Sequence, residues 1–261
     1  MSECESLAES LTELSTVPPW LRPAIAALDP WPATTTEAKA IQRDWRDRVI
    51  HQDQFGGLKN LKTVAGVDVG FEEQGAIARA AVALLDFPSL EPLGVAIARL
   101  PTPFPYIPGF LSFREIPVII HALAQLTQTF PEQPGLIICD GQGYAHPRRF
   151  GLACHLGVML GCPTLGAAKS RFIGEHPPVE SEKGAWEALS DRDETIGAVL
   201  RTRTNVRPLY ISVGHRISLD SAIELVLRCT PKYRLPETTR WADKIASQRG
   251  SDDSYAHLIC R

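Results

Sequence analysis

The chain has 261 residues, of which 44% are hydrophobic and 22% are charged, and its formal net charge is −3. This composition is typical of a soluble globular protein that buries a core in one large domain or two small ones. It argues against a protein that binds nucleic acid mainly by bulk positive charge, and no apolar run approaches the roughly 20 residues of a membrane span.

Residues 1–30 are predicted to form an N-terminal extension, which could be flexible, ahead of a single domain over residues 31–261. Leu7, Leu11 and Leu14 have the spacing of a weak amphipathic helix, and five prolines interrupt the chain after them. The start of the chain is acidic and lacks the basic and apolar segments of a secretory signal. We therefore expect a cytoplasmic protein.

The six cysteines are scattered, without a C-x-x-C pair or a Cys/His cluster of zinc-site spacing. A structural zinc site is correspondingly disfavoured. Reduced thiols are expected, with Cys139 inside a strand.

The folded part is predicted to begin with a helix over residues 35–50. Thr34 and Glu37 have the spacing of a capping box, which satisfies backbone N–H groups at a helix start. Ile41 and Trp45 then begin an apolar stripe that recurs every four residues.

Residues 64–71 read as a strand because every second residue is apolar. This alternation places Asp68 on the face opposite to the apolar one. Gly66 and Gly70 flank Asp68 on its own face, where they leave room for a ligand or for another backbone segment.

Apolar periodicity predicts the remaining elements. Strands are expected over 76–87, 93–100, 136–139, 163–167, 195–201 and 208–213, and helices over 116–130, 147–160, about 219–227 and 238–247. Three strands followed by alternating helices and strands favour an α/β fold with a mixed central sheet flanked by helices. Buried parallel strands need a helical layer on each face, and the later helices can supply one of these layers.

A proline-rich loop, residues 101–108, separates the third strand from the next helix. Its four prolines fix φ and remove backbone donors, so the loop is stiff and poorly suited to a sheet. Such a loop can hold Tyr106, with Ile107 and Pro108, outward as a planar wedge. A wedge of this kind fills the gap that forms when a base leaves a nucleic-acid stack.

Three carboxylates stand at positions suited to metal binding. Asp140 ends a short apolar strand, and open α/β sheets bind ligands at the carboxyl ends of their strands. If the strand of Asp68 lies beside it, the two carboxylates can share one divalent cation, which relieves their repulsion. Glu115 has a competing role as the partner of Ser112 in a capping box. Pro117 favours a helix that starts near Glu115 instead, so a functional Glu115 is the preferred interpretation.

Other polar residues are weak signals when taken singly. Asp243 and Lys169 each fit a solvated surface, although Lys169 follows a strand and could meet a phosphate there as a point charge. Gly141 and Gly143 lack the spacing of a phosphate-binding loop and instead permit close backbone approach to a planar ligand. His146 could border a pocket at that place.

Several separate blocks, in order along residues 35–247, together resemble the endonuclease V family of deoxyinosine-directed repair nucleases, which have a ribonuclease H-like fold. The blocks are Gly66-Val67-Asp68, Pro105-Tyr106-Ile107-Pro108, Phe113-Arg114-Glu115, Asp140-Gly141-Gln142-Gly143 with His146-Pro147, Lys169-Ser170, Ser212-Val213-Gly214-His215 and the run from Leu235 to Asp243. The block that joins the wedge to the glutamate is highly specific, whereas any single aspartate is not. Residues 1–30 lie outside the resemblance.

The resemblance implies a role for each of these residues and a catalytic role for the domain as a whole. Asp68, Glu115, Asp140 and Lys169 would be catalytic, and Asp68, Asp140, Glu115 and Asp243 would hold Mg²⁺, for which Mn²⁺ would substitute. Tyr106, Ile107 and Pro108 would separate the strands, and Gly109, Leu111, Gly141, Gly143 and His146 would form a pocket for hypoxanthine. The implied reaction, by a monomer acting on damaged DNA, hydrolyses the second phosphodiester bond 3′ to a deaminated purine and leaves 3′-hydroxyl and 5′-phosphate ends.

Two other functions stay open. A different ribonuclease H-like nuclease with the same metal site would act on inosine-containing RNA or on branched DNA. A nucleic-acid-binding module whose acidic residues are only structural would bind without cutting.

Overall fold

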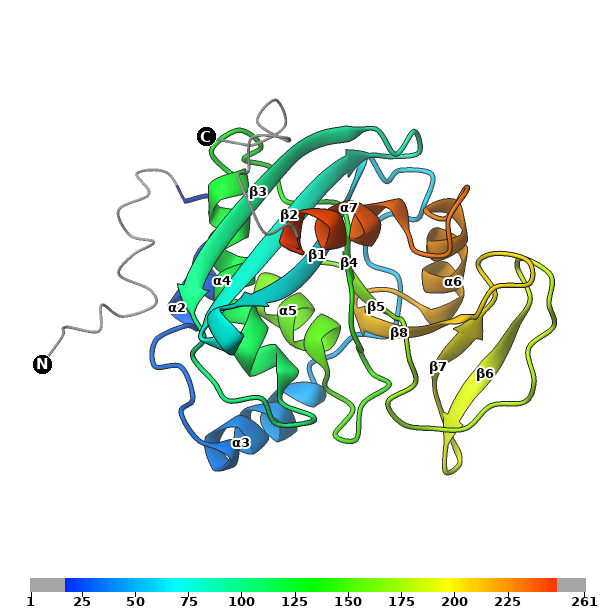
Figure 1. Cartoon of the computed structure of the whole chain (residues 1–261), viewed down its shortest axis with the longest axis horizontal. Coiled ribbons are helices and arrows are strands. Elements are labelled where there is room, and N and C mark those ends of the chain that lie inside the picture. The colour runs from blue at the N-terminus through cyan, green and yellow to red at the C-terminus, as the bar shows by residue number, and fades with distance from the viewer. Residues whose placement is uncertain (1–16, 248–261) are drawn as a thin grey trace, which may run out of the picture.

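A computed structural model describes residues 17–247 and arranges them around one mixed sheet of eight strands (Figure 1). The strands are β1 (Thr63–Glu72), β2 (Ile77–Asp86), β3 (Pro92–Pro101), β4 (Ile137–Cys139), β5 (Thr164–Ala168), β6 (Trp186–Asp191), β7 (Glu194–Leu200) and β8 (Leu209–His215). The helices are α2 (Arg22–Ala26), α3 (Thr35–Arg46), α4 (Leu111–Leu126), α5 (Leu152–Leu160), α6 (Leu219–Arg228) and α7 (Glu237–Ala246), with a short 3₁₀ turn, η1 (Glu73–Gly75), after β1.

The strand order is β3-β2-β1-β4-β5-β8-β7-β6. β1, β2 and β3 form an antiparallel meander. β4 joins β1, and β5 joins β4, in parallel, so three parallel strands occupy the centre of the sheet. β8, β7 and β6 continue it with antiparallel pairs. The predicted α/β fold with a mixed central sheet flanked by helices is confirmed.

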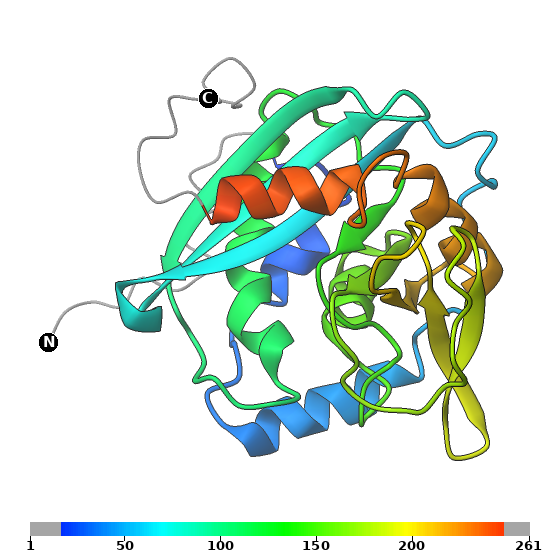
Figure 2. The same ribbon diagram turned by 45° about the vertical axis from the view of Figure 1, so that its right-hand side comes forward.

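Helices cover both faces of the sheet. α4 and α5 pack on one face together with α2, over residues such as Ala65 and Val67 (Figure 1). α6 and α7 pack on the other face, over residues such as Val64 and Ile138, and α7 crosses the strands of the meander (Figure 2). Because successive side chains of a strand point to opposite faces, one set of strands contributes to both hydrophobic cores.

Helix α4 begins earlier than the sequence predicts. It starts at Leu111, after an N-cap at Phe110 that makes no side-chain capping bond, so the start predicted near Glu115 is wrong. Ser112 is not a capping residue either, because its hydroxyl instead pairs with Nδ1 of His155 at 3.0 Å. Glu115 therefore lies in the second turn of the helix.

Pro117 is accommodated inside α4 by a donor from outside the helix. A proline at this position removes the N–H group that would bond to the carbonyl of Phe113. Nε1 of Trp31 donates to that carbonyl oxygen at 2.9 Å. The helix can therefore continue through the proline without an unsatisfied buried acceptor.

Two further elements differ from the sequence prediction. β6 is missed because it is a half-exposed strand at the sheet edge, without clean apolar alternation. The helix predicted over 147–160 begins only at Leu152. The residues before it form a loop in which Arg149 has a φ of 57° and Gly151 N–H bonds to Gly143 O.

Part of the predicted N-terminal extension is integrated into the fold. Leu21, Ala24 and Leu28 are buried in the core that contains α4 and α5. The weak helix expected around Leu7–Leu14 lies outside the described residues. We therefore propose a single domain that includes residues 17–30.

Within residues 17–247 the cysteines are free and buried, and Cys139 lies in β4 as predicted. In the same part of the chain, no helix combines the length and the apolar character needed to span a membrane.

Candidate active site

Asp68 lies within β1, where two glycines let helix α7 approach the sheet closely. A Cβ atom on Gly66 would lie 2.2 Å from the backbone carbonyl of Thr238, and Gly70 makes a similar approach to the other end of α7. A side chain at either position would displace the helix. The space that the sequence leaves beside Asp68 is thus filled by the backbone of α7, which brings Asp243 to the same place.

Asp140 reaches the site from the neighbouring strand. β1 and β4 are parallel, with Val67 opposite Cys139, so the residues that follow them, Asp68 and Asp140, are also neighbours. Asp68, Asp140 and Asp243 each present a carboxylate oxygen, and the three oxygens lie within 4.8 Å of one another. We refer to these three side chains as the acidic cluster.

Lys169, which follows β5, bridges two members of the acidic cluster. Its Nζ lies 2.5 Å from Oδ2 of Asp140 and 2.8 Å from Oδ1 of Asp243. Burial alone would lower the pKa of Lys169, but the two carboxylates outweigh burial and raise this pKa above its ordinary value. The side chain is therefore a fixed positive charge at the edge of the cluster.

One lysine does not balance the negative charge of the acidic cluster. Burial, and then the charge of Asp140, raises the pKa of Asp68 to about 7. Burial also raises the pKa of Asp140, despite its contact with Lys169. Oδ2 of Asp140 is buried without a well-directed hydrogen bond, although Nζ of Lys169 is close to it. Such a set of oxygens fits a hard divalent cation, which would favour their ionised forms.

Glu115 lies beside the acidic cluster and is only 7% exposed. Burial, and then the charges of Asp68 and Asp140, raises its pKa well above the ordinary value. Among the described residues it is not part of the mutually close set of carboxylate oxygens. Its position suits a group that supports the cluster from the protein core.

A pocket of ≈ 390 Å³ opens beside the acidic cluster, and Asp140 and Lys169 form part of its wall. The wall also contains Tyr106, Ile107, Pro108, Gly109, Leu111, Gly141 and His146, which are all the residues predicted for the wedge and the base pocket except Gly143. Tyr106 is 72% exposed, as expected for a side chain that a stiff loop holds outward.

Gly143 serves the packing of the loop rather than the wall of the pocket. Its N–H group donates to Oγ of Ser212 at 2.9 Å, and a Cβ atom on it would lie 2.1 Å from the carbonyl oxygen of Val213. The close approach that this glycine permits is therefore to the backbone of β8.

His146 forms one wall of the pocket in a fixed orientation. Its Nε2 lies 3.1 Å from the carbonyl oxygen of Gly109, and its Nδ1 accepts from the N–H of Arg148 at 3.2 Å. These partners assign the ring proton to Nε2. Burial, and then the charge of Arg148, lowers the pKa of His146 to about 3, so the ring is neutral.

Sequence reasoning misses three residues at or behind the pocket. Phe172 lines it, with its ring centroid 5.6 Å from that of His146. Gln42 and Arg148 lie behind the wall and hydrogen-bond to each other. A polar residue four positions after Ala38, on the buried face of an amphipathic helix, is the signal that could have identified Gln42.

Comparison with known proteins finds relatives named Endonuclease V, by sequence and by structure. The family model for Endonuclease V matches residues 43–244. The Endonuclease V of Trichormus variabilis is 59% identical over 220 residues, which are 84% of this chain and 97% of that protein. The crystal structure of the Endonuclease V from Streptomyces avermitilis superposes with a TM-score of 0.76 at 44% identity, covering 83% of this chain and 92% of that one.

A more distant structure includes a nucleic acid. The Endonuclease V of Ciona intestinalis, in complex with a 24mer DNA containing an inosine followed by a ribo-adenosine, has a TM-score of 0.71 at 27% identity. The match covers 80% of this chain and 94% of that one. The family match, the high identity over most of the chain and the shared fold lead to one conclusion: the chain belongs to the endonuclease V family, whose members are nucleases that hydrolyse phosphodiester bonds.

Proposed function

We propose that this chain is a metal-dependent DNA repair endonuclease that recognises deoxyinosine. It cleaves the second phosphodiester bond 3′ to the lesion and leaves 3′-hydroxyl and 5′-phosphate ends. The observation that carries the proposal is the contact between two sites: Asp140 and Lys169 belong both to the charged centre and to the wall of the pocket next to Tyr106. A base held in the pocket brings the backbone of its own strand to the acidic cluster.

The relatives support this class of substrate. The Ciona intestinalis protein was crystallised with inosine-containing DNA, and its fold matches most of this chain. Deaminated adenine mispairs, and a mispaired base leaves the stack at lower cost than a Watson–Crick base. A pocket that accepts an extruded base therefore selects for such a lesion.

The residues present fit a divalent cation, for which we propose Mg²⁺, with Mn²⁺ as a substitute. Asp68, Asp140 and Asp243 would hold it, and Glu115 would support them. A bound divalent cation activates water and stabilises charge on a departing oxygen.

The chain's own residues supply the other requirements. Lys169 stays protonated and can stabilise negative charge on the phosphate. Tyr106 fills the place of the extruded base in the stack. His146 is neutral, so its ring adds no charge to the part of the wall that would face a neutral base. Because one chain provides all of these groups, we propose a monomer as the active unit, acting in the cytoplasm.

The test uses matched oligonucleotides that carry inosine or adenosine at one position, as DNA and as single-stranded RNA, with Mg²⁺ or with EDTA. We expect cutting of inosine-containing DNA at one bond on the 3′ side, and no cutting in EDTA. Faster cutting of inosine in RNA would support the RNA nuclease instead. Binding without any metal-dependent cutting would support the non-catalytic module.

Two variants separate chemistry from recognition. Asp140→Ala should abolish cutting while binding stays measurable, and full activity in this variant would exclude the proposed metal role. Tyr106→Ala should weaken binding of inosine-containing DNA by ~1–3 kcal/mol, the usual contribution of a stacked base. Trp186→Ala, which removes an exposed aromatic residue on β6, is the matched control and should bind normally.

A further inference from the structure

Gln42 is a buried polar residue of α3 that contacts both sides of the pocket. It is 0% exposed. Its Nε2 donates to the carbonyl oxygens of Gly109 at 3.0 Å and Phe150 at 3.2 Å, and its Oε1 accepts from Nε of Arg148 at 2.5 Å. Both amide hydrogens and the amide oxygen are therefore used, which fixes the orientation of the side chain.

The two carbonyl groups belong to segments that are distant in the sequence. Gly109 directly follows the wedge residues, and we call residues 105–111 the wedge loop. Phe150 ends the segment that carries His146, and we call residues 143–150 the pocket loop. Gln42 is thus a direct link, from a third element, between the loop that separates strands and the loop that borders the base pocket.

The carbonyl oxygen of Gly109 is the centre of this link. Besides Gln42, it contacts Nη2 of Arg148 at 2.6 Å and Nε2 of His146 at 3.1 Å. Gly109 has a φ of +83°, and a Cβ atom on it would lie 2.7 Å from Nη2 of Arg148. The conformation favours glycine at this position, and a side chain here would push the guanidinium group of Arg148 away from the carbonyl oxygen.

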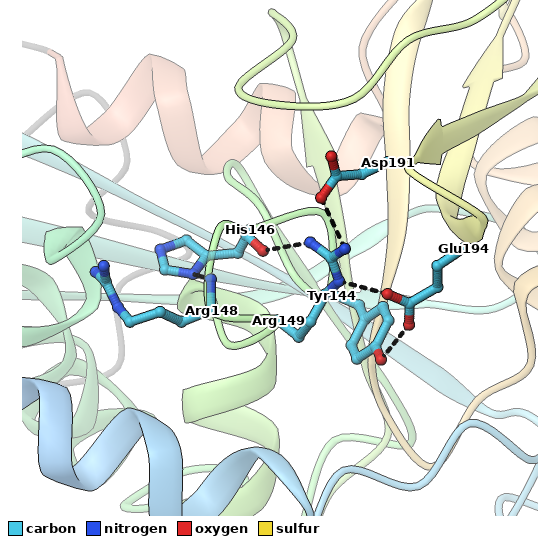
Figure 3. Close-up of polar contacts among 6 residues, drawn as sticks. All are labelled: Tyr144, His146, Arg148, Arg149, Asp191 and Glu194. Atoms are coloured by element: carbon cyan, nitrogen blue, oxygen red, sulfur yellow. Dashed lines mark hydrogen bonds and ion pairs between the residues drawn. The ribbon is translucent and has the colours of Figure 1, made fainter.

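The pocket loop is also held from its other side. Figure 3 shows Arg148 and Arg149 extending in opposite directions from neighbouring positions. The guanidinium group of Arg149 lies 2.7 Å from Asp191 and 2.7 Å from Glu194, which flank the β6–β7 turn. The pocket loop is therefore fixed to the hairpin by Arg149 and to the wedge loop through Arg148 and Gln42.

We propose that Gln42 is a positioning residue that sets the separation between the wedge loop and the pocket loop. Insertion of Tyr106 and capture of the extruded base then occur on one rigid unit. The inference rests on the proposed function for its substrate, and it adds a residue outside both the pocket wall and the acidic cluster. Loss of this link should weaken recognition of inosine and leave the hydrolysis of bound DNA nearly unchanged.

The variant Gln42→Glu tests the link most directly. It keeps the length of the side chain and the acceptor for Arg148, but it turns a carboxylate oxygen toward the two carbonyl groups that Nε2 now serves. In single-turnover cutting of inosine-containing DNA, we expect the half-saturating enzyme concentration to rise about tenfold or more, because two buried hydrogen bonds are lost. The maximal rate should change by less than about threefold if the barrier of the chemical step is unaffected.

Two other variants control for charge and folding. Gln128→Glu makes the same change of charge at an exposed position after α4 and should leave both parameters unchanged. Gln42→Met removes these two hydrogen bonds and also the one from Arg148, without adding charge, and it should weaken recognition at least as much as Gln42→Glu. An unchanged half-saturating concentration, or a fall confined to the maximal rate, would overturn the inference.

Amide hydrogen exchange supplies a readout that needs no substrate. Gln42→Glu and Gln42→Met should increase exchange in the wedge loop and the pocket loop together, with β4 unchanged as the check on folding. Unaltered exchange in both loops would overturn the inference, whatever the enzyme cuts. If wild type does not distinguish inosine from adenosine, the proposed function fails, while the exchange data still decide whether Gln42 holds the two loops together.

Discussion

Several titratable side chains of the described chain are buried, and burial is the first cause of their altered pKa values. The pKa values of Asp68 and Glu115 are raised, because their charged forms lose water. For the same reason the pKa values of His146 and His155 are lowered, and both rings are neutral. A bound cation would offset the cost of burying charged carboxylates, whereas the described residues offer no such compensation for a buried histidine that becomes charged at low pH.

His155 gives a pH-dependent prediction. Burial lowers its pKa from 6.5 to about 3. Below pH 6.5 the His155 side chain takes up a proton in the unfolded chain but not in the native protein, which favours unfolding. The free energy of unfolding therefore has its full value above pH 6.5, as far as His155 is concerned, and falls as the pH is lowered toward 3. Between pH 7 and pH 5 the loss should be about 2 kcal/mol. The variant His155→Gln retains a polar partner for Ser112. We expect it to remove this part of the pH dependence of the free energy of unfolding, as measured by urea unfolding.

The control for this measurement is His176→Gln, at a histidine that is not buried. This variant should keep the full slope of wild type. Parallel stability curves for wild type and His155→Gln would contradict the prediction. His155 packs against four aromatic rings, and some constant loss of stability is therefore expected at every pH; the rings are Trp31, Trp45, Phe113 and Phe150.

At the scale of elements, two helices reach the site because the sheet and the N-terminal segment accommodate them. α7 can lie on β1 only because Gly66 has no side chain. α4 carries Glu115 through a turn that contains Pro117, and Trp31 supplies the donor that the carbonyl of Phe113 lacks there. The carboxylates are therefore placed by backbone contacts that no single helix or strand could make alone.

A double-mutant cycle tests the contact between Trp31 and α4. Trp31→Phe keeps an aromatic ring but leaves the Phe113 carbonyl without its donor, so we expect a loss of ~1–3 kcal/mol in the free energy of unfolding. Pro117→Ala restores an N–H group within the helix that can bond to the same carbonyl. The effect of Trp31→Phe should therefore be smaller in the Pro117→Ala background. Strictly additive effects would show that the indole N–H does not compensate for the proline.

Across the whole molecule, the acidic cluster and Glu115 beside it come from the sheet and from both of its covering layers. β1 and β4 contribute from the sheet itself, and α7 contributes from one covering layer. α4 adds Glu115 from the opposite layer. A ligand of the cluster therefore connects elements from across the fold, and its binding should stabilise the folded chain as a whole.

Thermal unfolding with and without Mg²⁺ tests this. A ligand of the native state present at one hundred times its Kd adds about 2.7 kcal/mol to the free energy of unfolding, so Mg²⁺ should raise the Tm. The increase should be larger at pH 8 than at pH 6, because the pKa of Asp68 is about 7 and protons compete with the cation below it. Asp68→Asn should remove most of the increase, whereas Asp44→Asn, at an exposed site on α3, should retain it. An equal Tm increase in all three proteins would place the cation elsewhere.

Much of the fold follows from patterns within short stretches of chain. Alternation locates β1, apolar runs locate β2 and β3, and the capping box of Thr34 and Glu37 locates the start of α3. The order of the motif blocks along the chain is enough to identify the family. The proximity of Asp68 and Asp140 is predicted only on the condition that their strands are neighbours, and the parallel pairing of β1 with β4 meets that condition. These features are readable because each depends on residues a few positions apart, or on the general rules for parallel sheets.

The remaining features depend on partners far along the chain. The start of α4 cannot be read locally, since the residue that compensates Pro117 lies 82 positions before Phe113. Gly143 resembles a ligand contact in the sequence but packs against β8, and Gln42 shows its role only when two distant loops meet beside it. Local periodicity reports which face of an element is apolar, whereas the identity of what covers that face is set by the packing of the whole chain.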